Sequence, residues 1–433
     1  MATITPAAEM AQKRGTVCPE SQDVSFRKMK DSGFEWIGEI PVEWKEYLLG
    51  QVTSEVKNKN IGMVEDNLLS LSYGKIKRKN INNTEGLLPT SFEGYNVIDA
   101  GDIVLRLTDL QNDHTSLRVG QAKERGIITS AYVTIRPTSF IISAFLYYLL
   151  HAFDIRKGFY GMGSGVRQGL THTEIKTLKV VMPEKSEQYS IVSYLDAQCA
   201  EIDDIIASAK ASIEDYKQWK ASVIYEAVTK GLDPDVEMKD SGVDIIGVMP
   251  KHWDIKRQRF LCRTTTGNRD TQDAEEDGLY PFYVRSPIVE RSNSYTFEGE
   301  GILMAGDGAG AGKVFHYATG KYAIHQRVYC FHDFNNILPR FYYYFMSNLF
   351  SVEIEKGSAK STVPSVRMPM ILNFNFCIPP NEEQKAIVAY LDTQCSTIDQ
   401  LISEKETLIA DLESYKKSLI YEVVTGKRRV YDR

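Results

Sequence analysis

The 433-residue chain lacks an uninterrupted apolar run of about 20 residues, the length that a membrane-spanning helix needs. The nearest candidate, residues 140–153, contains Ser143, two tyrosines and His151, so it predicts a buried helix of a globular domain. The first fifteen residues also lack the apolar segment of a secretory signal. We therefore expect a cytoplasmic protein with no membrane partner.

Cysteine pairs of the CxxC type are missing as well. The six cysteines are widely spaced, and the seven histidines do not recur at the spacings of metal ligands. Both observations exclude the common zinc motifs and a disulfide framework. We expect free thiols, as in a reducing compartment, and no metal site.

Motifs of catalysis are absent or incomplete. The chain has no [ND]PP[YFW] motif of adenine methylation and no nuclease-like group of carboxylates with lysine. FYGMGSG (residues 159–165) matches the FxGxG of S-adenosylmethionine sites only superficially, because a helix rather than a strand is predicted before it. GDGAGAGK (residues 306–313) has Asp307 and Val314 where a P-loop needs Gly and Ser or Thr. The sequence therefore predicts a protein without chemistry of its own and without a cofactor.

Excess positive charge is lacking too, since the formal net charge is −6. The acidic surplus is local, however. Residues 183–240 carry 6 basic and 13 acidic side chains, so the rest of the chain is close to neutral and contains basic clusters. A local patch, not the total charge, decides whether a surface meets phosphates.

What the chain does contain is an internal repeat. PEKSEQYSIVSYLDAQCAEIDDII from residue 183 matches PPNEEQKAIVAYLDTQCSTIDQLI from residue 379 at an offset of 196, without a gap as far as the IYExVT endings. MKDSGFEWIGEIPVEW from residue 29 matches MKDSGVDIIGVMPKHW from residue 238 at an offset of 209. Each half thus has a shared opening, a divergent middle and a shared end.

Both shared ends predict long helices. Apolar residues recur in steps of four and three, which is the seam of a coiled coil. The seam positions are Leu195, Cys199, Ile202, Ile206 and Ile213 in the first copy and Leu391, Cys395, Ile398, Ile402 and Ile409 in the second. We expect the two helices to pack antiparallel around midpoints at residues 208 and 404; the alternative is that each packs only on its own domain.

The divergent middles predict mixed α/β domains with short strands. The predicted fold class is therefore α+β: two globular α/β domains in tandem repeat, separated by a pair of long antiparallel coiled-coil helices with pseudo-twofold symmetry. Arginine suits guanine, and asparagine or glutamine suits adenine, by bidentate hydrogen bonding. The polar candidates for DNA contact in the first middle are Lys75, Lys77, Arg78, Lys79, Arg106, Asp109, Gln111, Asn112, Arg118, Arg167 and Gln168. Those in the second middle are Asn268, Arg269, Arg285, Asp307, Lys313, Gln326, Arg327, Lys360 and Arg367.

These repeated blocks resemble the specificity subunits of Type I restriction-modification systems. The resemblance rests on the paired WIGEIPVEW and IIGVMPKHW openings, the PxxxEQxxIVxYLDxQCxxID blocks and the IYExVT endings, and it covers about residues 29–425. It implies an N-terminal extension that could be disordered (1–28), a first target recognition domain (29–182), a central helical region (183–237), a second recognition domain (238–378) and a C-terminal helical region (379–433).

The resemblance also implies a function in phage defence. Each recognition domain reads one half of a split, asymmetric site in double-stranded DNA, and the helical pair sets the spacing. Two modification subunits bind S-adenosylmethionine and methylate adenine N6, and up to two motor-nuclease (restriction) subunits use ATP and Mg²⁺. The chain itself is then a non-catalytic subunit. Two alternatives stay open: a self-sufficient DNA methyltransferase, and a coiled-coil DNA-binding scaffold or regulator without a modification partner.

Overall fold

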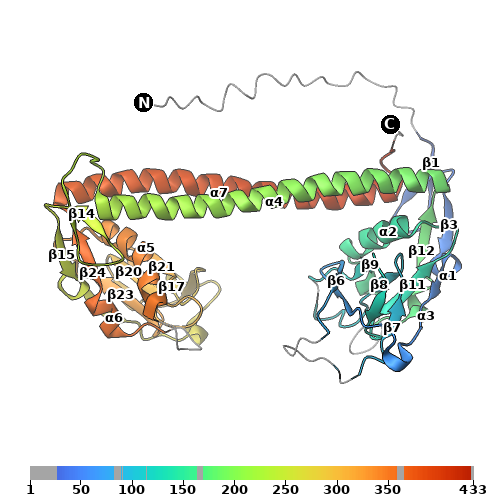
Figure 1. Ribbon diagram of the computed structural model, residues 1–433, viewed down its shortest axis with the longest axis horizontal. Coiled ribbons are helices and arrows are strands. Elements are labelled where there is room, and N and C mark those ends of the chain that lie inside the picture. Colours follow the sequence, from blue (N-terminus) through green and yellow to red (C-terminus); the bar gives the residue numbers. More distant parts are fainter. Residues whose placement is uncertain are drawn as a thin grey trace, which may run out of the picture. The chain divides into compact units, whose positions relative to one another are not determined.

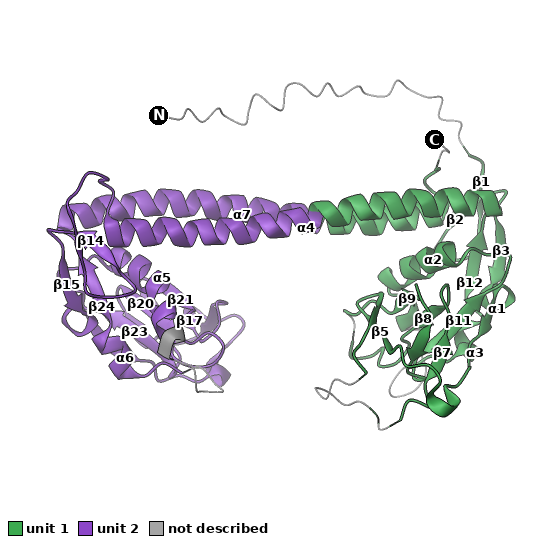
Figure 2. Ribbon diagram, viewed as in Figure 1, with its two compact units in different colours: residues 1–205, 411–433 green, residues 206–410 purple. Residues whose placement is uncertain are grey.

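The computed structural model describes residues 27–81, 89, 91–113, 115–162, 169–357 and 365–430. The chain forms two compact units (Figure 2): the first contains residues 1–205 and 411–433, and the second contains residues 206–410. Both boundaries fall inside a long helix, so each helix contributes one end to each unit. Of the predicted N-terminal extension, only Arg27 and Lys28 lie within the described residues.

The first unit is built around a four-stranded antiparallel sheet of order β4-β11-β8-β9. These strands are β4 (Thr53–Glu55), β8 (Ile103–Leu105), β9 (Val119–Gln121) and β11 (Val133–Pro137). Two-stranded ladders surround it: β1 (Met29–Asp31) with β2 (Glu39–Pro41), β3 (Lys45–Leu48) with β12 (Lys179–Met182), β5 (Leu69–Ser72) with β6 (Lys75–Arg78), and β7 (Asn96–Ile98) with β10 (Gly126–Ile128). The helices of this domain are α1 (Leu49–Val52), α2 (Ser143–Ile155) and α3 (His172–Ile175).

The second unit repeats this framework around a sheet of order β16-β23-β20-β21. Its strands are β16 (Arg263–Thr266), β20 (Gly301–Ala305), β21 (Phe315–Ala318) and β23 (Val328–His332). The outer ladders are β13 (Met238–Asp240) with β14 (Val248–Pro250), and β15 (Asp254–Arg257) with β24 (Asn375–Ile378). The helices are α5 (Pro339–Gly357) and α6 (Met368–Asn373).

The two units differ in one sheet. Where the first has the β5-β6 and β7-β10 ladders, the second has a four-stranded sheet of order β18-β17-β22-β19. Its members are β17 (Tyr280–Tyr283), β18 (Glu290–Ser292), β19 (Phe297–Glu298) and β22 (Lys321–Ile324), and β17 and β22 run parallel. The mixed α/β character predicted for both middles is confirmed, and the divergence is concentrated in this part of each domain.

The predicted long helices are α4 (Lys185–Lys230) and α7 (Asn381–Val424). In each unit the start of one packs beside the end of the other, running in the opposite direction (Figure 1). Lys416 pairs with Asp203 in the first unit, and Lys220 pairs with Asp399 in the second, each at 2.6 Å. Eight of the ten seam positions are buried, and Ile402 and Ile409 are half-buried.

The register of this helix pair corrects the predicted midpoints. The two ion pairs are equivalent under the 196-residue repeat, because Asp203 corresponds to Asp399 and Lys220 to Lys416. That symmetry centres the antiparallel register between residues 211 and 212 of α4 and between residues 407 and 408 of α7. The prediction of 208 and 404 took helix length as its guide, whereas charge pairs and seam packing fix the register.

The repeated motifs turn out to attach each domain to the start of a helix. The Glu of the EQ pair accepts a hydrogen bond from the tryptophan that ends the opening motif: Trp44 Nε1 to Glu187 at 3.1 Å, and Trp253 Nε1 to Glu383 at 2.9 Å. The Gln accepts the backbone N–H that precedes the domain helix, Ile142 to Gln188 at 2.8 Å and Leu338 to Gln384 at 2.7 Å. The two glutamines are buried, and their hydrogen bonds are satisfied in the same way in both units.

The IYExVT endings attach the other end of each helix. The Tyr225 hydroxyl donates to the Ile246 carbonyl at 3.0 Å, and the Tyr421 hydroxyl donates to the Ile37 carbonyl at 3.2 Å. The opening motif of each half therefore packs on the helix end that comes from the other half of the sequence. In the second unit Ile224 and Val228 of α4 share one core with Leu391 of α7, which makes the helix ends part of the domain.

Within the described residues no helix is both long and apolar enough to span a membrane. The same residues contain no group of three or more potential metal ligands. Cys199, Cys262, Cys330, Cys377 and Cys395 are free thiols.

Candidate DNA-contact surfaces

In the second unit, Asp307 holds two arginines that the sequence had grouped as candidates. Its carboxylate lies 3.0 Å from Nη1 of Arg285 and 3.3 Å from Nη1 of Arg327. Arg285 follows β17, Asp307 follows β20, and Arg327 precedes β23, so three separate connections meet here. The arginine side chains remain 45% and 64% exposed, which leaves donors available for DNA.

The glycine-rich segment GDGAGAGK forms a tight turn that places Asp307. Gly306 donates to the Arg327 carbonyl at 2.8 Å and accepts from Val366 at 2.8 Å. Gly308 and Gly312 have positive φ, and a side chain at Gly312 would overlap Ile354. Glycine is therefore required for backbone conformation and close packing, not for a nucleotide phosphate. Lys313 is exposed at the end of this turn.

A second set of polar side chains includes Gln326, which precedes Arg327 on the connection between β22 and β23. Gln326 Nε2 donates to Asp270 at 2.7 Å, and Arg269 donates to the Ser294 hydroxyl at 2.5 Å. Arg269 also bridges His325 through the backbone. The pKa of His325 is lowered, chiefly by burial and then by the charge of Arg285, so the imidazole is neutral near pH 7. Asn268 is exposed next to Arg269.

In the first unit, Arg118 is not a contact residue, which corrects its prediction. Its side chain is fully buried, and its guanidinium donates to four backbone carbonyls and to a tyrosine hydroxyl. The partners are the carbonyls of Arg106 (3.0 Å), Thr108 (2.8 Å), Asp109 (3.2 Å) and Asp113 (2.5 Å), and Tyr160 (3.0 Å). Arg118 therefore shapes the loop after β8 from inside.

That loop carries four other candidates at the surface. Asp109 adopts positive φ and accepts a hydrogen bond from Asn112 Nδ2 at 2.8 Å, while Gln111 is exposed between them. Arg106 is half-buried and lies 3.5 Å from Asp113. The pKa of the Asp113 carboxyl is lowered well below its usual range, first by hydrogen bonds from Ser116. Hydrogen bonds from Arg118 thus hold the loop on its buried side, and contacts of Asp109 and Asp113 hold it on its exposed side.

The basic cluster of β6 divides between two faces of its hairpin. Arg78 forms a bidentate pair with Glu124, and its Nε lies 2.7 Å from Oε1. Lys75, Lys77 and Lys79 are all exposed, and Lys75 also lines a cavity next to α2 and α4. Lys77 and Lys79 are therefore the better candidates for phosphate contact.

Four of the predicted contact residues remain to be considered. Arg167, Gln168 and Lys360 lie outside the described residues. Arg367 is exposed, and its carbonyl accepts from Met370 at the start of α6. Sequence reasoning missed the acids that orient the candidates, Glu124, Asp113 and Asp270. Only Asp270 had a signal, since it directly follows the Asn268–Arg269 pair.

Comparison with known proteins agrees with the repeat-based resemblance. The sequence model of the type I restriction modification DNA specificity domain matches residues 250–411, which cover most of the second domain and most of α7. In sequence the chain is therefore similar to the specificity subunits of Type I restriction-modification systems.

Individual relatives match this chain over different lengths. The EcoDI specificity subunit of Escherichia coli is 26% identical over 181 residues, 42% of this chain and only 40% of that protein. The putative MjaX specificity subunit of Methanocaldococcus jannaschii is 22% identical over 91% of this chain and 96% of that protein. A chain solved in work on complex assembly and conformational transition of the type I R-M system has a TM-score of 0.67, with 15% identity over 90% of this chain and 99% of that chain. At that identity the structural match shows that the two chains share a fold.

Removing the charges of Lys77 and Lys79 should weaken DNA binding and flatten its salt dependence. Each phosphate contact contributes about 0.9 to the slope of log K against log salt, so the K77A/K79A variant should lose nearly two units. R78A is the matched control: its guanidinium is already paired with Glu124, so its slope should change by less than one unit. Equal slopes for K77A/K79A and the unaltered protein would show that these lysines are only solvated.

Proposed function

We propose that this chain is the sequence-specific DNA-binding subunit of a Type I restriction-modification complex, in which each recognition domain reads one half of a bipartite asymmetric site. The observation that carries the proposal is the combination of identical anchors and different inserts. The Trp–Glu, Gln–backbone and Tyr–carbonyl bonds recur in both units, whereas the sheet beyond them does not. A duplicated framework that carries two different polar surfaces is suited to a DNA site whose two halves differ in sequence.

The partners follow from this assignment. Double-stranded DNA is read by the two polar surfaces, and two modification subunits supply S-adenosylmethionine and adenine-N6 methylation. Up to two motor-nuclease subunits supply ATP- and Mg²⁺-dependent cleavage. The pseudo-twofold register of the helix pair favours two copies of one modification subunit, because it offers equivalent surfaces twice. We expect the complex to act in the cytoplasm and this chain to contribute no catalysis.

Exchange of one insert tests the proposal. β3 pairs with β12 along its whole length, so a graft should replace residues 45–182 and keep both strands together. The hybrid, combined with the modification subunit, should methylate a site with one new half and one unchanged half. The matched control replaces residues 254–378, bounded by β15 and β24, and should change the other half. Sequencing of methylated DNA reads both results, and a change in both halves from one graft would refute the separation.

The same assay separates the rival functions. A self-sufficient methyltransferase would modify DNA without a partner and would bind S-adenosylmethionine as an isolated chain. A scaffold without a modification partner would leave DNA unmethylated even when the modification subunit is supplied. Methylation that requires both this chain and the modification subunit is expected only from the proposed function.

A further inference from the structure

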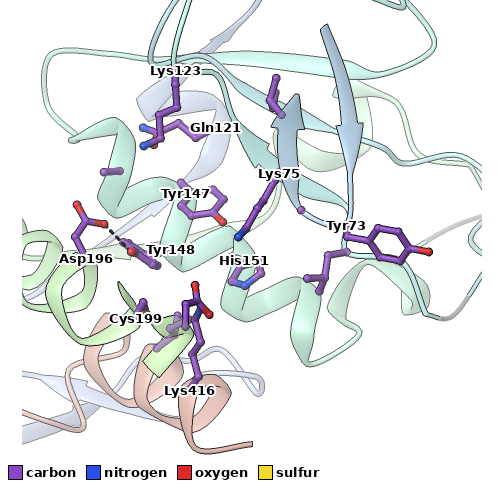
Figure 3. A pocket seen from close by; sticks show the side chains of 16 residues that line it. Tyr73, Lys75, Gln121, Lys123, Tyr147, Tyr148, His151, Asp196, Cys199 and Lys416 are labelled. Carbon is purple, nitrogen blue, oxygen red and sulfur yellow. Dashed lines mark hydrogen bonds and ion pairs between the residues drawn. The ribbon is translucent and has the colours of Figure 1, made fainter. Parts of the chain in front are cut away.

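A cavity of about 430 Å³ lies in the first unit, between the hairpin of β6, helix α2 and the two long helices (Figure 3). Such a volume is within the range of small-ligand pockets. Tyr147 lines it, and the Tyr148 hydroxyl donates to Asp196 of α4 at 2.6 Å. None of the bonds that explain DNA reading or helix pairing needs this space to be open.

The repeat copy shows what fills the equivalent place in the second unit. Arg340 in the first turn of α5 lies over the rings of Tyr317, Tyr343 and Tyr344, with its guanidinium carbon 5.1, 5.3 and 5.0 Å from their centroids. Its Nε donates to Asp392 at 2.9 Å. A planar cation is thus enclosed by aromatic faces and a carboxylate, an arrangement that favours guanidinium.

The first unit has part of this cage, without the arginine and without the third tyrosine, since Gln121 replaces Tyr317 and His151 stacks on Tyr147 at 5.5 Å. Tyr147, Tyr148 and Asp196 correspond to Tyr343, Tyr344 and Asp392 under the 196-residue repeat, and Arg340 corresponds to Ala144, which lines the cavity. The geometry is conserved between the copies within the chain. The tyrosine hydroxyl lies 2.6 Å from the aspartate in both units, and the two tyrosine centroids are 5.3 Å apart in the first and 5.6 Å in the second.

The aspartate of this cage is left without its cation. Within the described part of the chain no ion pair joins Asp196, whereas Asp392 pairs with Arg340. The opposite wall also differs, because Gln121 of β9 donates to Ser143 at 2.7 Å. Because Ala144 is short where Arg340 is long, the space beside the two tyrosines is an open cavity.

We propose that this cavity binds a guanidinium group, supplied either by an arginine side chain of a partner protein or by a small guanidinium compound. The bound cation would take the place of Arg340, stacking on Tyr147 and Tyr148 and pairing with Asp196. It would connect α2 with α4, as Arg340 connects α5 with α7. Occupation of the cavity thus ties the first recognition domain to the helix pair.

Three lysines line the same cavity and must be weighed against a cation. Lys416 is paired with Asp203 at 2.6 Å, and Lys123 donates to Gln121 at 2.7 Å, so both are engaged. Lys75 points into the cavity without an ion-pair partner among the described residues (Figure 3). It would repel a cation and attract an anion, which makes Lys75 the residue that distinguishes the two ligand classes.

Ligand-observed NMR with ethylguanidinium and the full chain tests the proposal at constant ionic strength. The unaltered protein should bind one equivalent, and propylammonium should bind more weakly because it cannot stack as a plane. A144R should abolish binding, because the new arginine fills the cage from within, and it should raise the melting temperature. D196N should weaken binding about tenfold, as expected for loss of a charge-assisted hydrogen bond.

Two further variants keep the test decisive. R340A should create a second site of the same kind, so that ethylguanidinium binds with two equivalents and restores part of the lost melting temperature. K75A should bind ethylguanidinium more tightly; weaker binding would overturn the assignment in favour of an anion site. Unaltered binding in A144R, or no binding to the unaltered protein, would also overturn it.

The source of the cation is resolved by two more probes. A capped Gly-Arg-Gly peptide that binds at least as tightly as agmatine supports an arginine of a partner protein. Agmatine binding without peptide binding supports a small guanidinium compound. Neither result depends on DNA methylation, so failure here leaves the proposed function standing.

Discussion

Replacing Arg118 by alanine is expected to destabilise the first unit by about 3–5 kcal/mol, the range for removing one member of a buried charged network. The fully buried guanidinium donates to four backbone carbonyls, of which those of Asp109 and Asp113 also accept from the Asp113 N–H at 3.3 Å and from the Tyr160 hydroxyl at 2.9 Å. Truncation leaves buried acceptors unsatisfied and a hole where the side chain was. Equilibrium unfolding in urea should show the loss in the transition of the first unit.

This loss should grow with pH. The pKa of Asp154, which accepts the Arg118 N–H at 2.6 Å, is raised to about 6, mainly by burial, and the charge of Arg118 opposes that rise. A carboxyl whose folded pKa lies above its unfolded value contributes stability below the unfolded value and loses it as pH rises through the folded value. Without Arg118 the Asp154 pKa should rise further, so R118A should be less destabilised at pH 5 than at pH 8.

R106A is the matched control. Arg106 belongs to the same loop, but it is half-buried and its ion pair with Asp113 is 3.5 Å long. Such pairs contribute about 1 kcal/mol or less. Equal stability of R118A and R106A would mean that Arg118 is not the internal support of the loop and would restore it as a contact candidate.

Arg118 also shows where sequence reasoning ends. An arginine in a divergent insert predicts a surface contact from its chemistry, because nothing local marks it as buried. Its burial depends on carbonyls brought together by the β8–β9 pairing and by the loop of Asp109 and Asp113, which are non-local features. Lys77 and Lys79, on an exposed hairpin edge, needed no such context.

The framework shared by the two domains was predictable because its motifs occur twice in the sequence. Glu187, Gln188, Tyr225 and their counterparts stand in matched blocks, and their bonds explain why those letters recur. The seam was predictable from heptad spacing alone. The two insert topologies were not, since strand order in β18-β17-β22-β19 follows from long-range pairing that alternation in one strand does not specify. The arginine pair around Asp307 was likewise not predictable, because it forms only where three separate connections meet in the fold.

Shortening both long helices by one heptad should shorten the nonspecific gap of the DNA site. The register centre determines which residues to remove: 208–214 from α4 and 405–411 from α7 are mutually paired about that centre. Their joint deletion keeps the seam on one face and leaves the Asp203–Lys416 and Lys220–Asp399 pairs in place. A deletion centred on 208 and 404 would instead remove residues that do not face one another.

Each helix would lose about 10 Å, at 1.5 Å per residue. Since duplex DNA rises about 3.4 Å per base pair, the methylated half-sites should move closer by about three base pairs. The half-site sequences should persist, because the deletion touches none of the candidate contact residues. The change of rotation about the DNA axis should lower the methylation rate, and sequencing of methylated DNA measures both effects. The control deletes only residues 208–214, which mispairs the seam and should abolish methylation. Efficient methylation of the original site with its original gap by the double deletion would show that the helix pair does not set the spacing.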